Sequence, residues 1–192
     1  MKNIAVFASG SGSDMQSVID GCESGLINGK VVAVIASRPG IFALERAAKH
    51  HIQSRVFNVK EYGSAQEKDK AIVEYLKPMG IDLIVLAGYL SIVSQPLLDV
   101  YEGRIINIHP SLIPRHCGKG MYGLHVHESV LASGDKVSGC TVHFVDSGTD
   151  TGKIIRQVTV PVQEGDTPET LQARVLKEEH KLLPQVVADL CK

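Results

Sequence analysis

The sequence has no excess of charge of either sign: 20 Lys and Arg residues face 21 Asp and Glu residues, for a net charge of −1. Proteins that hold the nucleic-acid backbone carry a clustered basic excess, so we expect no nucleic-acid partner. Hydrophobic residues make up 44% of the chain and charged residues 21%. This balance is typical of an ordinary soluble globular protein.

Long apolar segments and paired cysteines are also missing. The apolar run in the N-terminal "MKNIAVFASG" is too short for a secretory signal and far too short to span a bilayer. Cys22, Cys117, Cys140 and Cys191 are scattered, so free thiols are expected rather than a disulfide framework. These absences predict a cytoplasmic protein that does not associate with membranes.

No linker, repeat or low-complexity segment divides the chain, so residues 1–192 are expected to form a single domain. The first half alternates apolar strands with helical patterns. The expected strands there are residues 3–8, 30–37, 54–59 and 82–88, and the expected helices begin near residues 14, 41 and 64. Continuous apolar strands between helices predict a parallel sheet that is covered on both faces.

The pattern changes after Gly88. A strand at 104–109 and a helix at 124–134 are followed by strands at 137–146 and 152–162, whose side chains alternate as in antiparallel pairs, and by a final helix at 168–190. The predicted fold is therefore α/β, with a mostly parallel, mixed central sheet flanked by helices.

A glycine-rich loop, "ASGSGSD" at 8–14, joins the first strand to the first helix. Met15 stands where a dinucleotide-binding GxGxxG needs its third glycine, and no GK[ST] of a P-loop is present. One interpretation is a simple cradle for a single phosphate at a helix N-terminus, formed by Gly10, Ser11, Gly12 and Ser13. The other is a tight turn with Ser13 or Asp14 as the helix N-cap.

Two polar residues stand at the end of the strand "RIINIH". Asn107 and His109 share one face because side chains alternate on a strand, and Pro110 ends the strand directly afterwards. In open α/β sheets ligands bind at this edge. An Asn amide can donate to a developing oxyanion, and a His can donate when protonated or move a proton when neutral.

A carboxylate would orient that imidazole and raise its pKa. Asp150, in the glycine-flanked loop "VDSGTDTGK", is the first candidate, and Asp146 in the same loop is the second. The alternative is a core histidine bonded to backbone. Two converging polar groups and an acidic loop favour a catalytic site over that alternative.

A metal site is a further alternative. Four potential ligands lie within twelve residues: His116, Cys117, His125 and His127. Their spacing matches no common zinc signature, and "CGKGMYG" is typical of a flexible glycine loop, so no metal is expected. The role of His143, which alternates with Val142 and Phe144, is left open.

The last helix carries a carboxylate on its apolar stripe. Glu179 lies amid the arc formed by Leu171, Val175, Leu182, Leu183, Val186 and Leu190. A buried carboxylate is costly without a partner. It is either partly buried with a water or an Arg, with Pro184 kinking the helix nearby, or it accepts hydroxyls from a polar substrate such as a sugar.

Together these segments resemble the glycinamide ribonucleotide formyltransferase family. The matching pieces run in order from residue 4 to 184: "VFASGSGSDMQSVID", "DLIVLAGYLSIVS", "GRIINIHPSLIP", "GCTVHFVDSGTDTGKIIRQ" and "RVLKEEHKLLP". "NIHPSLIP" is typical of the wider formyltransferase superfamily, and the glycine loop with the C-terminal glutamate is typical of this member.

The resemblance implies a Rossmann-like fold that binds two small molecules, glycinamide ribonucleotide and the co-substrate 10-formyltetrahydrofolate, in purine synthesis. By position, Gly12, Ser13 and Asp14 match phosphate-binding residues, and Glu179 matches the residue that holds the ribose hydroxyls. The family's folate-binding residues match Leu90, Ser91, Ile92, Val93 and Asn107. The backbone of 90–93 is expected to form hydrogen bonds with the pteridine. Monomer and homodimer both stay open.

The resemblance also implies the chemistry. Asn107, His109 and Asp150 match the catalytic trio. The glycinamide amine attacks the formyl carbon, Asn107 and protonated His109 stabilise the tetrahedral oxyanion, and Asp150 keeps the histidine protonated and helps to move a proton from the amine to the leaving folate nitrogen.

Two positions depart from the family pattern. Asp14 stands where an Asn is usual, and Ala65 where an arginine often reaches the folate; Lys60 or Lys68 is the expected substitute. Three other functions are alternatives. A 10-formyltetrahydrofolate hydrolase is expected to have an added N-terminal domain, and a formyltransferase for initiator tRNA is expected to have a C-terminal extension and a basic face. The third alternative is a non-catalytic nucleotide-binding module. The trio argues against the last.

Overall fold

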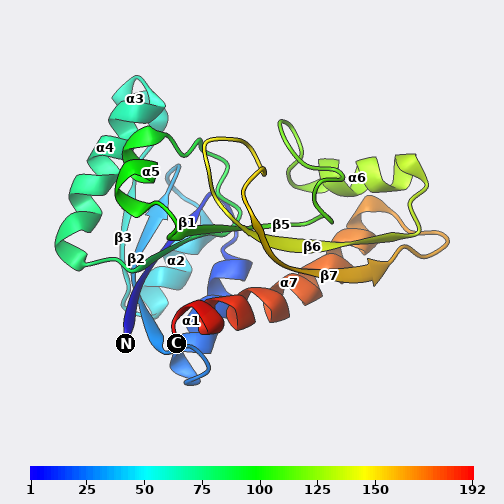
Figure 1. Cartoon of the computed structure of the whole chain (residues 1–192), viewed down its shortest axis with the longest axis horizontal. Helices are drawn as coiled ribbons and strands as arrows, with labels where there is room; N and C mark the ends of the chain where they lie inside the picture. Colours follow the sequence, from blue (N-terminus) through cyan, green and yellow to red (C-terminus); the bar gives the residue numbers. More distant parts are fainter.

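A computed structural model describes residues 1–192 (Figure 1). A seven-stranded sheet in the order β3-β2-β1-β4-β5-β6-β7 forms its centre. The strands are β1 (Lys2–Ala8), β2 (Gly29–Ala36), β3 (Gln53–Val56), β4 (Leu83–Leu86), β5 (Ile105–His109), β6 (Val137–Phe144) and β7 (Ile154–Pro161). The helices are α1 (Ser13–Glu23), α2 (Phe42–Lys49), α3 (Val59–Tyr62), α4 (Ala65–Leu76), α5 (Gln95–Tyr101), α6 (Leu124–Ser133) and α7 (Pro168–Leu190), with a 3₁₀ turn at Lys77–Met79.

Five strands run parallel. β1 pairs with β2 and β4, β2 with β3, and β4 with β5, whereas β6 is antiparallel to both β5 and β7. The mostly parallel, mixed sheet is therefore confirmed, as is the antiparallel character of the last two strands.

Helices cover both faces of the sheet, as the continuous apolar strands predict. The side chains of Ile4 and Val6 on β1 pack with those of α1, α2 and α7. The alternate residues Ala5 and Phe7 pack with those of α4 and α5 on the other face. Figure 1 shows α7 running beside α1, away from the group formed by α3, α4 and α5. No helix combines the length and the apolar character that crossing a membrane requires.

Two short helices are absent from the sequence prediction. The strand expected at 54–59 ends at Val56, because the Asn58 side chain accepts a hydrogen bond from the Lys60 N–H and starts the single turn α3. α5 begins after Ser94 with Pro96 in its first turn, where a missing N–H costs no intrahelical bond. Both helices are too short for their periodicity to be recognised in the sequence.

The final helix has the predicted bounds, 168–190. Thr167 caps it reciprocally with Thr170, and the helix continues through Pro184. The apolar stripe ends earlier than expected, since Leu183 is fully buried whereas Leu190, in the last turn, is 37% exposed. The two leucines therefore contribute unequally to stability.

Leu183→Ala should lower the free energy of unfolding by about 2–5 kcal/mol, the usual cost of a cavity at a buried leucine. Leu190→Ala is the matched control on the same helix and should change it by less than about 1 kcal/mol. Urea unfolding followed by circular dichroism measures both. Equal losses for the two variants would contradict the burial described here.

Candidate active site

Three loops follow the C-terminal ends of neighbouring strands at the edge of the sheet where Asn107 and His109 lie. Residues 9–12 follow β1, 87–94 follow β4 and 110–123 follow β5. β1 leads to α1 on one face of the sheet and β4 leads to α5 on the other. The chain therefore diverges between β1 and β4, which is where open α/β sheets bind their ligands.

The glycine loop leaves the start of α1 without a side-chain cap. Gly12, not Ser13 or Asp14, is the N-cap residue, with φ +76. A Cβ on Gly12 would lie 2.8 Å from the Ala43 Cβ. Arg46 Nε braces the loop by donating to the Ser11 carbonyl oxygen at 2.8 Å. The uncapped N–H groups and the helix dipole favour an anion at this position.

A polar cavity of about 370 Å³ opens beside this loop. No apolar residue lines it, and its lining residues are Ser13, Gln16, Ser17, Asp20, Arg46 and His180. Its composition suits a charged or hydroxylated group rather than an apolar one.

Glu179 pairs with another acid rather than with an Arg. The Glu179 residue is 6% exposed, and its carboxyl group shares a hydrogen bond with that of Asp14 on α1. Burial raises the pKa of both groups, most strongly that of Glu179, whose nearness to Asp14 raises it further. Glu179 therefore holds the proton and donates it to Asp14.

The Asp14 side chain is turned toward α7. His180 Nε2 lies 3.5 Å from its Oδ1, and the Asp14 side chain is 13% exposed. Because the carboxyl group faces Glu179 and His180, the backbone N–H of Asp14 is the group left for an anion on the glycine loop.

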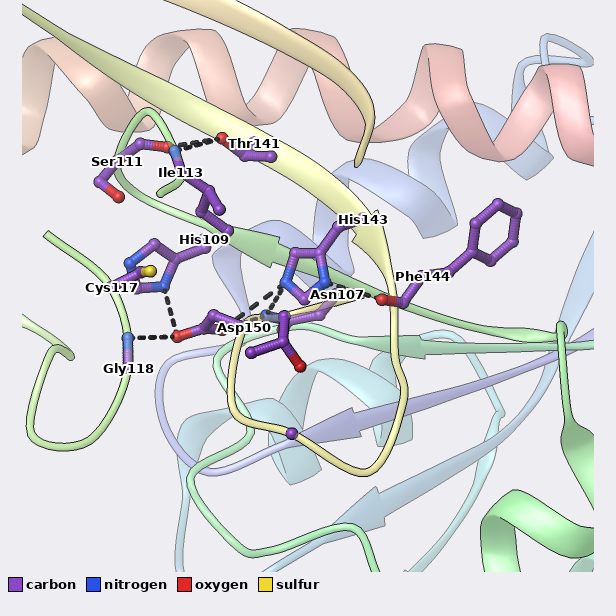
Figure 2. Close-up of polar contacts among 12 residues, drawn as sticks. Asn107, His109, Ser111, Ile113, Cys117, Gly118, Thr141, His143, Phe144 and Asp150 are labelled. Carbon is purple, nitrogen blue, oxygen red and sulfur yellow. Dashed lines mark hydrogen bonds and ion pairs between the residues drawn. The ribbon is translucent and has the colours of Figure 1, made fainter. Parts of the chain in front are cut away.

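At the end of β5 the structure brings Asn107, His109 and Asp150 together (Figure 2). Asn107 Nδ2 donates to Asp150 Oδ1 at 3.5 Å, and His109 Nδ1 lies 3.7 Å from Asp150 Oδ2. Asp150 adopts the left-handed conformation with φ 57, which non-glycine residues rarely do. Asp146, the second candidate, instead binds Gly148 and Thr151 in its own loop.

His143 is a fourth member of this cluster. It is the cross-strand partner of Asn107, and its Nε2 lies 3.1 Å from Asn107 Nδ2 and 3.6 Å from Asp150 Oδ1. Its Nδ1 donates to the Phe144 carbonyl oxygen at 2.9 Å, which holds the ring with Nε2 facing Asn107 and Asp150. The alternation along β6 shows which face His143 occupies, but its pairing with Asn107 depends on the register of two strands distant in sequence.

The loop after β5 folds over the cluster. The His116 carbonyl oxygen accepts from His109 Nε2 at 3.0 Å. The Gly118 N–H donates to Asp150 Oδ2 at 3.0 Å (Figure 2). Both ring nitrogens of His109 are therefore directed at protein oxygens, and the ring is fixed in one orientation.

The charge states follow from burial and contacts. Burial raises the pKa of Asp150, but His143, His109 and the Gly118 N–H outweigh it, so the net pKa is lowered and Asp150 is ionised. Burial lowers the pKa of His109 by more than the His116 carbonyl and Asp150 raise it. The net pKa of His109 is therefore lowered in the free protein, which favours the neutral ring.

The segment 90–93 presents its larger side chains outward. Leu90 is 57% and Ile92 69% exposed, and the Leu90 N–H donates to Ser9 Oγ at 2.8 Å. Of the lysines expected to replace an arginine at Ala65, Lys60 is exposed on α3 and Lys68 is fully buried beneath this segment. Lys68 therefore cannot extend into solvent toward a ligand.

The histidines considered for a metal have separate partners. His116 binds Ser129 and Asp135, His125 contacts Glu128, and burial lowers the pKa of His127 to about 4. No group of three or more His, Cys, Asp or Glu side chains is placed to hold a metal ion, and all four cysteines are free.

Comparison with known proteins identifies the family of the chain. Residues 2–187 match the formyl transferase family. The chain is 42% identical to the chloroplastic phosphoribosylglycinamide formyltransferase of Arabidopsis thaliana, covering 99% of this chain and 65% of that protein. It is 38% identical to the phosphoribosylglycinamide formyltransferase of Haemophilus influenzae, covering 97% and 86%.

Longer relatives and solved structures extend the comparison. The chain is 41% identical to the trifunctional purine biosynthetic protein adenosine-3 of Drosophila melanogaster but spans 14% of its length. The solved glycinamide ribonucleotide transformylase 1 of Geobacillus kaustophilus superposes over the whole of both chains with TM-score 0.93 and 40% identity. The chain therefore belongs to the formyl transferase family. Within that family, its branch is that of the phosphoribosylglycinamide formyltransferases, and its fold is the Rossmann-like one of these neighbours.

Gly12→Ala should lower the free energy of unfolding by roughly 1–3 kcal/mol, because the new Cβ meets Ala43 and the left-handed backbone strains any other residue. Gly10→Ala is the control, since nothing lies within 4 Å of its added Cβ. Chemical denaturation gives both values. A Gly12 variant as stable as the Gly10 variant would show that the loop is not held as described.

Asp14→Asn should make the protein more stable at pH 8 than the wild type. Because both carboxyl pKa values are raised above the ordinary 3.8 and 4.5, the contribution of the pair to stability is full below about pH 4. That contribution is lost as the pH rises through the raised values. The Asn amide can instead donate to an ionised Glu179.

Thermal unfolding from pH 5 to 8 tests this prediction. The Tm advantage of Asp14→Asn should grow by a few degrees across this range. Asp20→Asn, an exposed acid on the same helix, should follow the wild type throughout. Parallel pH profiles for Asp14→Asn and the wild type would exclude the shared proton.

Proposed function

We propose that this protein transfers the formyl group of 10-formyltetrahydrofolate to the amine of glycinamide ribonucleotide in purine synthesis. The observation that carries the proposal is the cluster of Asn107, His109, His143 and Asp150. It lies at the end of β5, beside the segment 90–93 that follows β4, on the same sheet edge as the glycine loop that follows β1. The names of the relatives support the acceptor and the transfer of a formyl group.

The ribonucleotide binds on the α1 side. Its phosphate accepts from the backbone N–H groups of Gly12, Ser13 and Asp14, and its ribose hydroxyls bind the Glu179 carboxyl group. The buried acid pair supports this role, since its remaining carboxyl oxygen lone pairs can accept from hydroxyl groups.

The folate binds on the β4 side. The exposed Leu90 and Ile92 side chains offer apolar surface to a flat ring. The carbonyl oxygen of Leu90, both backbone groups of Ser91 and Val93, and the Ile92 N–H have no hydrogen-bond partner within the chain. These groups are free to form hydrogen bonds with the polar edge of a pteridine.

In the reaction, the amine nitrogen attacks the formyl carbon and an oxyanion forms. The Asn107 amide releases its 3.5 Å contact with Asp150 Oδ1 and donates to that oxygen. Neutral His109 takes the proton that the amine releases, and ionised Asp150 stabilises the resulting imidazolium. His109 then donates to the leaving folate nitrogen as its bond to the formyl carbon breaks. To reach the substrates, His109 Nε2 gives up its bond to the His116 carbonyl. The ring then carries its proton on Nδ1, facing Asp150 Oδ2, which leaves Nε2 free to accept the proton of the amine.

Release of tetrahydrofolate, followed with and without glycinamide ribonucleotide, tests the proposed reaction. A transferase releases tetrahydrofolate only when the ribonucleotide is present, and the ribonucleotide then gains the formyl group. Equal release in both tubes would show a hydrolase. No release in either tube from folded protein would show a non-catalytic binding module.

His109→Ala should lower kcat roughly 10²-fold or more, because the proton acceptor is lost. The control is His125→Ala, whose side chain is 59% exposed and should leave kcat unchanged. Steady-state kinetics with both substrates saturating, together with thermal unfolding, separates loss of chemistry from loss of fold. A His109 variant with wild-type kcat would remove this residue from the mechanism.

A further inference from the structure

Lys68 is a buried charge that the proposed chemistry does not use. It lies in the first turn of α4 and is 0% exposed. Its Nζ donates to Tyr89 Oη at 3.1 Å, to Ser91 Oγ at 2.7 Å and to the Ile92 carbonyl oxygen at 2.9 Å. An ammonium has three N–H groups, so all of them are committed to the segment 89–92.

Asp69, the next residue, holds the far end of the same segment. Its Oδ2 accepts from both the N–H and the Oγ of Ser94, each at 2.6 Å. Its Oδ1 lies 3.2 Å from Lys68 Nζ but accepts no hydrogen bond, as expected when the ammonium has no donor left. Both side chains are 0% exposed. Such buried ion pairs rarely stabilise a fold more than apolar residues of the same size would, so stability alone does not account for this one.

The segment that this pair holds has no regular secondary structure. Residues 87–94 lie between β4 and α5, in neither a helix nor a strand. Their backbone shape depends on side chains from elsewhere: Ser9, which accepts from the Leu90 N–H, and the Lys68–Asp69 pair. The inner side of the segment is thus anchored, while Leu90 and Ile92 face outward.

We propose that Lys68 and Asp69 are positioning residues that hold segment 89–94 in the one shape in which its outer side binds the folate ring. This inference rests on the proposed function, which assigns that outer side to folate. Lys68 acts through the segment and does not touch the ligand, because its three donors are committed and it has no exposed surface. Without the ammonium, Ser91 Oγ and the Ile92 carbonyl oxygen lose the hydrogen bonds that hold the segment. The unpaired backbone groups of residues 90–93 are then no longer held in position for the folate.

Lys68→Met keeps the length of the side chain and removes the ammonium. We expect the Kd for tetrahydrofolate, measured by calorimetry, and the KM for 10-formyltetrahydrofolate to rise about tenfold. The KM for glycinamide ribonucleotide should change less than twofold, because its proposed site lies on the α1 side of the divergence between β1 and β4. The control is Lys70→Met, which removes an exposed lysine two residues along α4 and should change none of these values.

A double-mutant cycle with Ser91→Ala tests whether Lys68 acts on folate binding through Ser91. Ser91→Ala alone should weaken tetrahydrofolate binding about threefold, and in the Lys68→Met background it should add nothing. If Lys68→Met does not fold because Asp69 is left unpaired, Lys68→Met/Asp69→Asn removes both charges and takes its place. Ser91→Ala keeps both charges and can be measured in either case.

Two results would overturn the inference. One is unchanged folate affinity in the folded Lys68 variant or in Ser91→Ala, and the other is an equal rise in the KM values of both substrates. Failure of the proposed function has a different signature: wild-type protein that binds no tetrahydrofolate would remove the folate assignment itself, and with it this role for Lys68.

Discussion

The site depends on a reversal in how the chain crosses the sheet. β1 and β4 are hydrogen-bonded neighbours, yet the chain leaves β1 toward one face and β4 toward the other. The connections therefore diverge and leave an open edge between them. The glycine loop and segment 90–93 form the two sides of this edge, and β5 delivers Asn107 and His109 beside them. Fold and proposed chemistry thus share one geometric cause.

Desolvated polar groups are concentrated around this edge. An acid pair that shares a proton lies beneath the glycine loop, an ion pair lies beneath segment 89–94, and His109 is buried beside ionised Asp150. The free-energy cost of burial is offset differently in each case. The acid pair is protonated, the ion pair combines opposite charges, and His109 forms hydrogen bonds that orient its ring. Together they fix the shape and charge of the edge, so that most of its functional groups are oriented before any substrate binds.

Prediction from sequence succeeded where local patterns decide. The long final helix, the apolar strands and the change to antiparallel pairing were all readable, because side-chain periodicity reports which face is buried. Asn107 and His109 could be placed on one face for the same reason. The turn α3 and the short α5 could not be recognised, since Asn58 capping and a single proline leave no periodic signal.

The sequence by itself determined which residues are available for chemistry: a glycine loop at a helix start, an amide and an imidazole at a strand end, and acids at positions 150 and 179. Only the tertiary structure decided their partners and charges. It paired Glu179 with Asp14, added His143 to the cluster, buried Lys68 and favoured neutral His109. The physical reason is that desolvation and strand register arise from contacts between residues distant in the chain, which no local pattern encodes.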